Sequence, residues 1–200
     1  MGAKNVCVLD GGLRSWKAGA YPLSVDPPAE APPQVFRAAY DASFFRSLGQ
    51  VAAGIHSLSK LNYNEKDPSV GLIIDARSTP RFNGEVDEPR PGLRRGHLPF
   101  SVNVPWDSVL DPTTNEFLSQ HEMLRIFNQA GFDPMLNLKA KVTFSCGSGV
   151  TACVPLLALA HFWNISLGHF SVYDGAWSEW GGLTETRTYP SEITAKVKIT

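Results

Sequence analysis

Short apolar runs alternate along this 200-residue chain with segments whose apolar residues recur at helical spacing. Five runs predict strands, at residues 34–38, 70–75, 101–104, 141–145 and 170–173. Three segments predict helices, at residues 41–59, at residues 120–129 and from residue 149 onward. Because strands alternate with helices, we predict an α/β fold, in which a parallel sheet of about five strands is flanked by helices on both faces.

The first residues repeat the pattern of the last strand and helix. Residues 6–10 predict a strand, which a Gly-Gly turn separates from a short helix at residues 13–17. Residues 170–180 have the same order of an apolar strand, an Asp-Gly turn and a helical turn that carries Trp. The start of the chain therefore resembles the end of an incomplete first copy of the domain.

This repeat and a proline-rich segment divide the chain into four parts. Residues 1–20 are interpreted as the end of the first copy, and residues 21–33 as a stiff linker, because proline-rich segments are extended. Residues 34–187 then form the complete domain, and residues 188–200 a C-terminal tail.

The overall composition excludes several classes of protein. Hydrophobic residues make up 43% and charged residues 18% of the chain, which is typical of a soluble globular protein. A net charge of -1 gives no reason to expect direct nucleic acid binding, and no apolar run approaches the roughly 20 residues that span a membrane. Three cysteines without a paired framework or a secretory signal favour an intracellular location, mitochondrial or cytoplasmic, and we expect neither a metal nor a cofactor.

Cys146 is the main candidate for chemistry, because it lies in a glycine-rich loop between a predicted strand and a predicted helix. Gly147 and Gly149 let the backbone curl so that successive N–H groups face one point, and the helix N-terminus adds partial positive charge. Such a loop stabilises a thiolate nucleophile, and it would hold a persulfide with the same donors. A buried structural cysteine is the alternative interpretation.

Protein tyrosine phosphatases also place a cysteine in such a loop, but they follow it with an arginine in a Cys-x5-Arg motif. Ala152 occupies that position here, and the loop carries no charge to clamp a phosphate dianion. The sequence therefore disfavours a phosphatase.

The cysteine loop and three other motifs resemble the rhodanese family, in the branch that uses mercaptopyruvate. The motifs are Cys146-Gly147-Ser148-Gly149-Val150-Thr151-Ala152, Asp75-Ala76-Arg77, Gly96-His97-Leu98-Pro99 and Asp174-Gly175-Ala176-Trp177. The thiosulfate branch carries basic residues in the loop, where this chain has glycine and serine. The resemblance covers residues 35–183 and implies that residues 1–20 end a first rhodanese domain.

The resemblance implies roles for the candidate site residues. Arg81 and Arg90 would bind the substrate carboxylate, although surface arginines also pair with nearby acids, here Glu85, Asp87 or Glu88. Four further substrate-binding residues are expected in the loop: Gly147, Gly149, Val150 and Thr151.

Three other residues near the loop have predicted roles as well. Ser148 is expected to act with the Cys146 nucleophile, by bonding the leaving enolate or by relaying a proton. Asp75 is expected to support the site, and Cys153 to be buried.

The implied activity is transfer of sulfur from 3-mercaptopyruvate, with thiosulfate as the second choice of donor. The sulfur would pass through a Cys146 persulfide to cyanide or to a thiol acceptor, such as thioredoxin or a sulfur-relay protein. The alternative is a rhodanese module with little or no turnover, which carries sulfur or binds a partner.

Overall fold

The structure is a computed structural model that describes residues 3, 6–30, 32–33, 35–60, 72–136, 141–183 and 189–192. Its sheet has five parallel strands in the order β1-β5-β4-β2-β3. The strands are β1 (Phe45–Arg46), β2 (Ile73–Asp75), β3 (Ser101–Asn103), β4 (Val142–Ser145) and β5 (Phe170–Tyr173). The predicted parallel five-stranded sheet is therefore confirmed.

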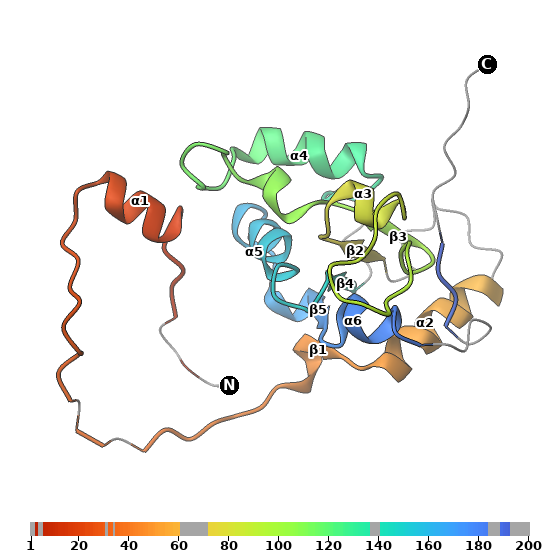
Figure 1. The fold of residues 1–200 in the computed structure, drawn as a ribbon, viewed down its shortest axis with the longest axis horizontal. Coiled ribbons are helices and arrows are strands. Elements are labelled where there is room, and N and C mark those ends of the chain that lie inside the picture. Colours follow the sequence, from red (N-terminus) through yellow and green to blue (C-terminus); the bar gives the residue numbers. More distant parts are fainter. Residues whose placement is uncertain are drawn as a thin grey trace.

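Helices cover both faces of this sheet (Figure 1). The α-helices are α1 (Gly12–Ala18), α2 (Leu48–Lys60), α3 (Thr79–Phe82), α4 (Gln120–Gln129), α5 (Cys153–Phe162) and α6 (Ala176–Trp180). The described residues also contain the 3-10 helices η1 (Ala42–Phe44), η2 (Trp106–Val109) and η4 (Leu167–His169).

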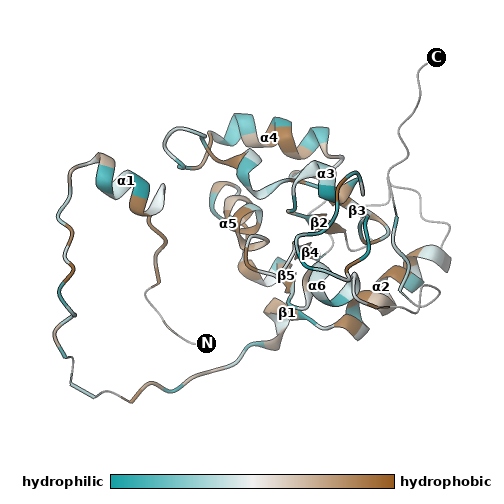
Figure 2. Cartoon of the chain, in the orientation of Figure 1, coloured by the Kyte–Doolittle hydropathy of each residue, from teal (hydrophilic) through white to brown (hydrophobic). Residues whose placement is uncertain are grey.

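Successive residues of β2 show how the two faces of the sheet form separate cores. Ile74 packs in one apolar cluster with residues of α4 and α5, such as Phe127 and Leu159. Ile73 packs in the other cluster, with Val51 of α2 and Trp177 of α6. Side chains of adjacent strand residues point to opposite faces, so one apolar strand contributes to both cores. Figure 2 shows the apolar colouring concentrated on α5, which lies against the sheet.

α4 occupies the predicted range, residues 120–129, because local signals determine both of its ends. Ser119 accepts a hydrogen bond from the backbone of Glu122, whose side chain bonds back to Ser119 in a capping box. Gly131 follows the helix with φ of 85°, a conformation that suits glycine.

The beginning of the domain differs from the prediction. Residues 35–38 form no strand, and Gln34 lies outside the described residues. Asp41 caps η1 by accepting a hydrogen bond from the Ser43 N–H at 2.9 Å, and the two-residue strand β1 follows before α2 begins at Leu48. The predicted single helix over residues 41–59 is therefore wrong in its first turns, because pairing with β5 fixes this segment as extended.

The N-terminal segment forms the predicted helix but not the predicted strand. Residues 6–9 are exposed and pair with no strand among the described residues, whereas α1 agrees with the prediction for residues 13–17. Asp10 accepts a hydrogen bond from the Phe117 N–H at 3.0 Å, and the Ser15 hydroxyl donates to Glu116 at 2.6 Å. These contacts fasten α1 to the domain, while the following residues make a long arc (Figure 1). The division into four parts stays a prediction.

The described part of the chain contains neither a candidate membrane span nor a candidate metal site. No helix there is long and apolar enough to cross a membrane. In the same residues, no cluster of three histidine, cysteine or acidic side chains is placed to hold a metal ion.

Candidate functional site

Cys146 follows β4 directly, at the carboxyl end of a strand in the middle of the sheet. Its side chain is buried, with 1% of the residue exposed, and its Sγ accepts a hydrogen bond from the Gly149 N–H at 3.1 Å. Gly149 has φ of 87°, and a Cβ there would lie 3.1 Å from the Asp174 carbonyl oxygen. Glycine is therefore required at the position that donates to the sulfur.

The rest of the loop offers unpaired backbone donors. Among the described residues, the N–H groups of Gly147, Ser148, Val150 and Thr151 donate to no protein acceptor. These groups are available to an incoming anion or to the outer sulfur of a persulfide, because no protein acceptor competes for them.

Helix α6 orients the loop by binding its carbonyl groups. The N–H of Trp177 donates to the Cys146 carbonyl at 2.9 Å, and the N–H of Ser178 donates to the Gly147 carbonyl at 3.0 Å. The Ser178 hydroxyl donates to the same Gly147 oxygen. In a trans peptide the N–H points opposite to the C=O, so the N–H groups of Gly147 and Ser148 are directed away from α6.

The predicted helix start at residue 149 is wrong, because α5 begins at Cys153. Residues 147–152 form bends and turns, so the helix N-terminus lies behind the loop rather than at the thiol. The Gly149 N–H, more than the helix dipole, therefore acts on Cys146.

Arg77 organises the second loop of the site, residues 76–96. It is 2% exposed, and it forms salt bridges with Asp75 at 2.6 Å and with Glu88 at 2.8 Å. It also donates to the Gly96 carbonyl at 2.8 Å, and its guanidinium lies 4.3 Å from the centre of the Trp177 ring. Asp75 thus fixes the position of the Arg77 side chain, and this buried network joins the loop to α6.

Arg81 and Arg90 both face the cysteine loop, and each also has a protein partner. Arg81 forms a salt bridge with Glu88, and its Nη2 lies 3.0 Å from the position of a Cβ built on Gly147. Arg90 donates to the Ser178 hydroxyl at 2.9 Å. Arg81 therefore pairs with Glu88, as the alternative interpretation expects, and also lies beside the cysteine loop.

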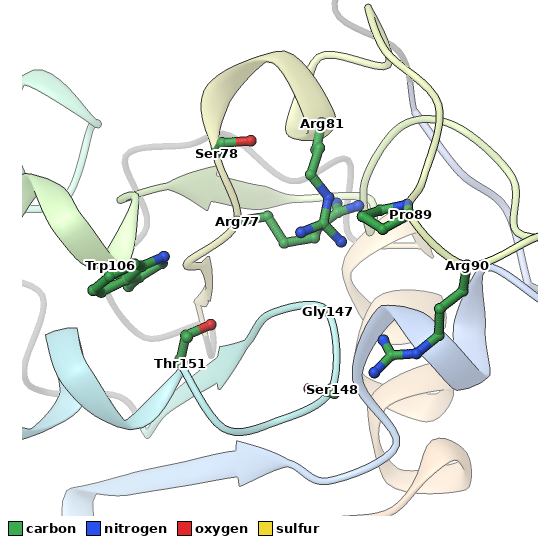
Figure 3. Close-up of a pocket in the computed structure, with 9 residues that line it drawn as sticks. All are labelled: Arg77, Ser78, Arg81, Pro89, Arg90, Trp106, Gly147, Ser148 and Thr151. Carbon is green, nitrogen blue, oxygen red and sulfur yellow. The ribbon is translucent and has the colours of Figure 1, made fainter.

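A cavity of about 460 Å³ lies between the two loops. Figure 3 shows its lining residues: Arg77, Ser78, Arg81, Pro89, Arg90, Trp106, Gly147, Ser148 and Thr151. In this view the side chains of Arg81 and Arg90 extend from separate segments toward the loop that carries Ser148.

The structure brings together five of the expected site residues in the lining of this cavity: Arg81, Arg90, Gly147, Ser148 and Thr151. Three others are buried and are not part of the lining: Asp75, Cys146 and Gly149. Val150 is not part of this lining, and 73% of the residue is exposed. Their roles in binding or catalysis stay predictions.

Sequence reasoning missed Trp106 and Ser178 at the site. Trp106 follows the carboxyl end of β3, and ligands of parallel sheets bind at such ends, so its position was a usable signal. Ser178 lies next to the Asp-Gly-Ala-Trp motif, but nothing in its sequence context indicates a contact with Arg90.

The expectation that Cys153 is buried is wrong. The residue is exposed, and its Sγ lies 3.8 Å from the Gly149 carbonyl oxygen. Its thiol is shielded enough that desolvation, with a smaller contribution from the nearby Cys146, raises its pKa above the ordinary cysteine value.

Comparison with known proteins gives consistent matches. The model of the rhodanese-like domain matches residues 57–183. The 3-mercaptopyruvate sulfurtransferase of Escherichia coli K12 is 37% identical over 189 residues, which are 94% of this chain and 60% of that protein. The mitochondrial thiosulfate/3-mercaptopyruvate sulfurtransferase 1 of Arabidopsis thaliana is 31% identical over an alignment that spans 90% of this chain and 48% of that protein.

A solved structure agrees with these relatives. The crystal structure of the 3-mercaptopyruvate sulfotransferase SseA from Escherichia coli superposes with a TM-score of 0.66 at 35% identity, over 89% of this chain and 58% of that one. The chain thus spans about half the length of the relatives that it matches.

Proposed function

Because the chain belongs to the rhodanese family, we propose that it is a sulfurtransferase, in which Cys146 takes a sulfur atom from 3-mercaptopyruvate and passes it to an acceptor. One observation carries this proposal. The sulfur of Cys146 accepts the Gly149 N–H in a loop whose other residues line a cavity with Arg81 and Arg90. A nucleophile, unpaired N–H donors and guanidinium groups are what a reaction with a thiol-bearing carboxylate needs.

In the first step, the Cys146 thiolate attacks the sulfur atom of 3-mercaptopyruvate. A bond forms between the two sulfur atoms, while the carbon–sulfur bond of the donor breaks and leaves its electron pair on the enolate of pyruvate. Protonation of this enolate gives pyruvate, and Cys146 becomes a persulfide. Ser148 lines the cavity, where its hydroxyl can donate to the enolate oxygen of the leaving group.

Arg81 and Arg90 would bind the donor carboxylate, since guanidinium groups recognise carboxylates through paired hydrogen bonds. The Arg77 network and Ser178 fix the backbone and side chains around them. Thiosulfate would use the same sites, and its sulfur would reach Cys146 with sulfite as the leaving group.

In the second step, an acceptor thiolate attacks the outer sulfur of the persulfide and releases the Cys146 thiolate. Thioredoxin or a sulfur-relay protein would supply this thiolate, and cyanide would leave as thiocyanate. The acceptor would approach through the open side of the cavity. We place this reaction in mitochondria or cytoplasm.

The alternative is a rhodanese module that carries sulfur with little turnover. Two observations support this alternative. Cys146 is 1% exposed, and no side chain among the described residues hydrogen-bonds to the Ser148 hydroxyl, so its proton relay has no partner there.

The test is to mix the purified chain with 3-mercaptopyruvate and to measure pyruvate together with the mass of the Cys146 peptide. We expect one added sulfur atom on Cys146, and pyruvate that continues to form when thiol acceptor is present. Cys146→Ser should abolish both signals, whereas the matched control Cys153→Ser should retain them. One equivalent of persulfide without continued pyruvate release would favour the carrier, and an unmodified Cys146 would refute both interpretations.

A further inference from the structure

Glu88 is a buried carboxylate at the edge of the proposed donor site. Its side chain is 1% exposed, and it forms salt bridges with both Arg77 and Arg81. Arg77 and Arg81 line the cavity, but Glu88 lies behind them and is not part of the lining. Glu88 therefore acts on the cavity through the two arginines and not by direct contact with a donor.

Glu88 also determines how much positive charge the cavity presents. Three guanidiniums line it, those of Arg77, Arg81 and Arg90. Asp75 and Glu88 are both buried and both pair with these arginines. The five groups together leave one net positive charge facing the cysteine loop, whose side chains other than the Cys146 thiolate are uncharged.

We propose that Glu88 is a specificity-determining positioning residue, which limits the cavity to one net positive charge and so favours a monoanionic sulfur donor over a dianionic one. The inference rests on the proposed sulfurtransferase activity. At neutral pH the carboxylate of 3-mercaptopyruvate carries one negative charge, whereas thiosulfate carries two. One net positive charge offsets a single unit of donor charge, so the second negative charge of thiosulfate stays unbalanced beside the Cys146 thiolate.

Removal of the Glu88 charge gives a measurable change in donor preference. Coulombic attraction scales with the product of the charges, so a second positive charge strengthens binding of a dianion twice as much, in free energy, as binding of a monoanion. With water close to the cavity this is on the order of threefold in affinity for each unit of donor charge. Glu88→Gln should therefore raise kcat/KM for thiosulfate relative to 3-mercaptopyruvate by about threefold.

Ser78→Lys supplies an independent test that leaves the buried network intact. Ser78 is exposed, lines the cavity, and makes no side-chain capping bond at the start of α3. A lysine there adds one positive charge, as Glu88→Gln does, without loss of a partner for Arg77. We expect the same direction of change in donor preference, and a steeper fall of kcat/KM with added salt, in both variants.

Two controls separate charge from position. Asp87→Asn removes a carboxylate from the neighbouring residue, which is 83% exposed in its side chain and pairs with Arg95, so donor preference should stay as in the wild type. Glu88→Asp keeps the charge but shortens the side chain, so it should change KM for both donors by the same factor.

The experiment measures kcat/KM for both donors with cyanide as the common acceptor, over a range of salt concentrations. Equilibrium affinities for pyruvate and thiosulfate are also measured on Cys146→Ser protein with and without Glu88→Gln. A wild-type protein that transfers no sulfur would refute the proposed activity, while the affinities would still test Glu88. An unchanged ratio in Glu88→Gln and Ser78→Lys, or an equal shift in Asp87→Asn or Glu88→Asp, would overturn the inference.

Discussion

Gly149→Ala is the substitution that best tests the description of the cysteine loop. Gly149 has φ of 87°, and a Cβ would lie 3.1 Å from the carbonyl oxygen of Asp174, a backbone atom that is held in place. A residue other than glycine in the left-handed region costs about 1–2 kcal/mol. For a domain of this size each kcal/mol lowers Tm by about 2–4 °C, so we expect a decrease of about 2–8 °C.

The same substitution should weaken the nucleophile. Relief of the strain moves the Gly149 N–H away from the Cys146 sulfur, which now accepts it at 3.1 Å. A hydrogen bond to a charged acceptor contributes about 1.5–3 kcal/mol, so its loss should slow formation of the Cys146 persulfide by about tenfold to a hundredfold. Single-turnover mixing with 3-mercaptopyruvate, followed by mass spectrometry, measures this rate.

Gly147→Ala is the matched control. A Cβ there meets only the end of the Arg81 side chain, at 3.0 Å from Nη2, and this flexible group can move. We expect a nearly unchanged Tm and a raised KM for the donor, because Arg81 is displaced from the loop. If Gly149→Ala keeps both the Tm and the persulfide rate of the wild type, the proposed hydrogen bond has no role in activating Cys146.

Two further predictions concern the surroundings of the site. Arg77→Met leaves Asp75 and Glu88 buried without the arginine that they share. The substitution should therefore lower the free energy of unfolding, measured in urea, by about 3–5 kcal/mol. A decrease below about 1 kcal/mol would contradict the buried network. Desolvation raises the pKa of the Cys153 thiol. In Cys146→Ser protein at pH 8, iodoacetamide should therefore alkylate Cys153 more slowly than free cysteine, and the rate should increase as the pH rises. A rate equal to that of free cysteine would refute the shielding of this thiol.

The part of the fold that sequence predicts correctly is the part with strong local signals. β2 and β4 are apolar runs flanked by polar loops, and α4 has its own capping box. Residues 6–10 have the same strand composition, yet they form no strand, because a strand exists only where a partner pairs with it. β1 shows the converse, since only pairing with β5 defines its two residues as a strand.

The residues of the site that the sequence predicts also lie in continuous motifs, whereas a role that depends on distant contacts is not predicted. The glycine-rich loop identified Cys146, and the resemblance to rhodaneses identified Arg81 and Arg90, because these motifs are continuous in sequence. Glu88 was recognised only as a possible ion-pair partner. Its burial between two arginines depends on how residues 76–96 fold back on β2, which no local pattern encodes.

The groups that would act on the sulfur are separate from the groups that would recognise the donor charge. The Gly149 N–H of the cysteine loop donates to the sulfur, whereas the charged groups belong to the loop after β2. The two meet where the Arg81 guanidinium lies against Gly147, in space that any side chain at residue 147 would enter. Glycine at residue 147 and arginine at residue 81 are therefore one feature. The positive charge of Arg81 lies beside the loop, where the Glu88 carboxylate partly neutralises it. Glu88 would not neutralise the charge of a basic residue within the loop in the same way.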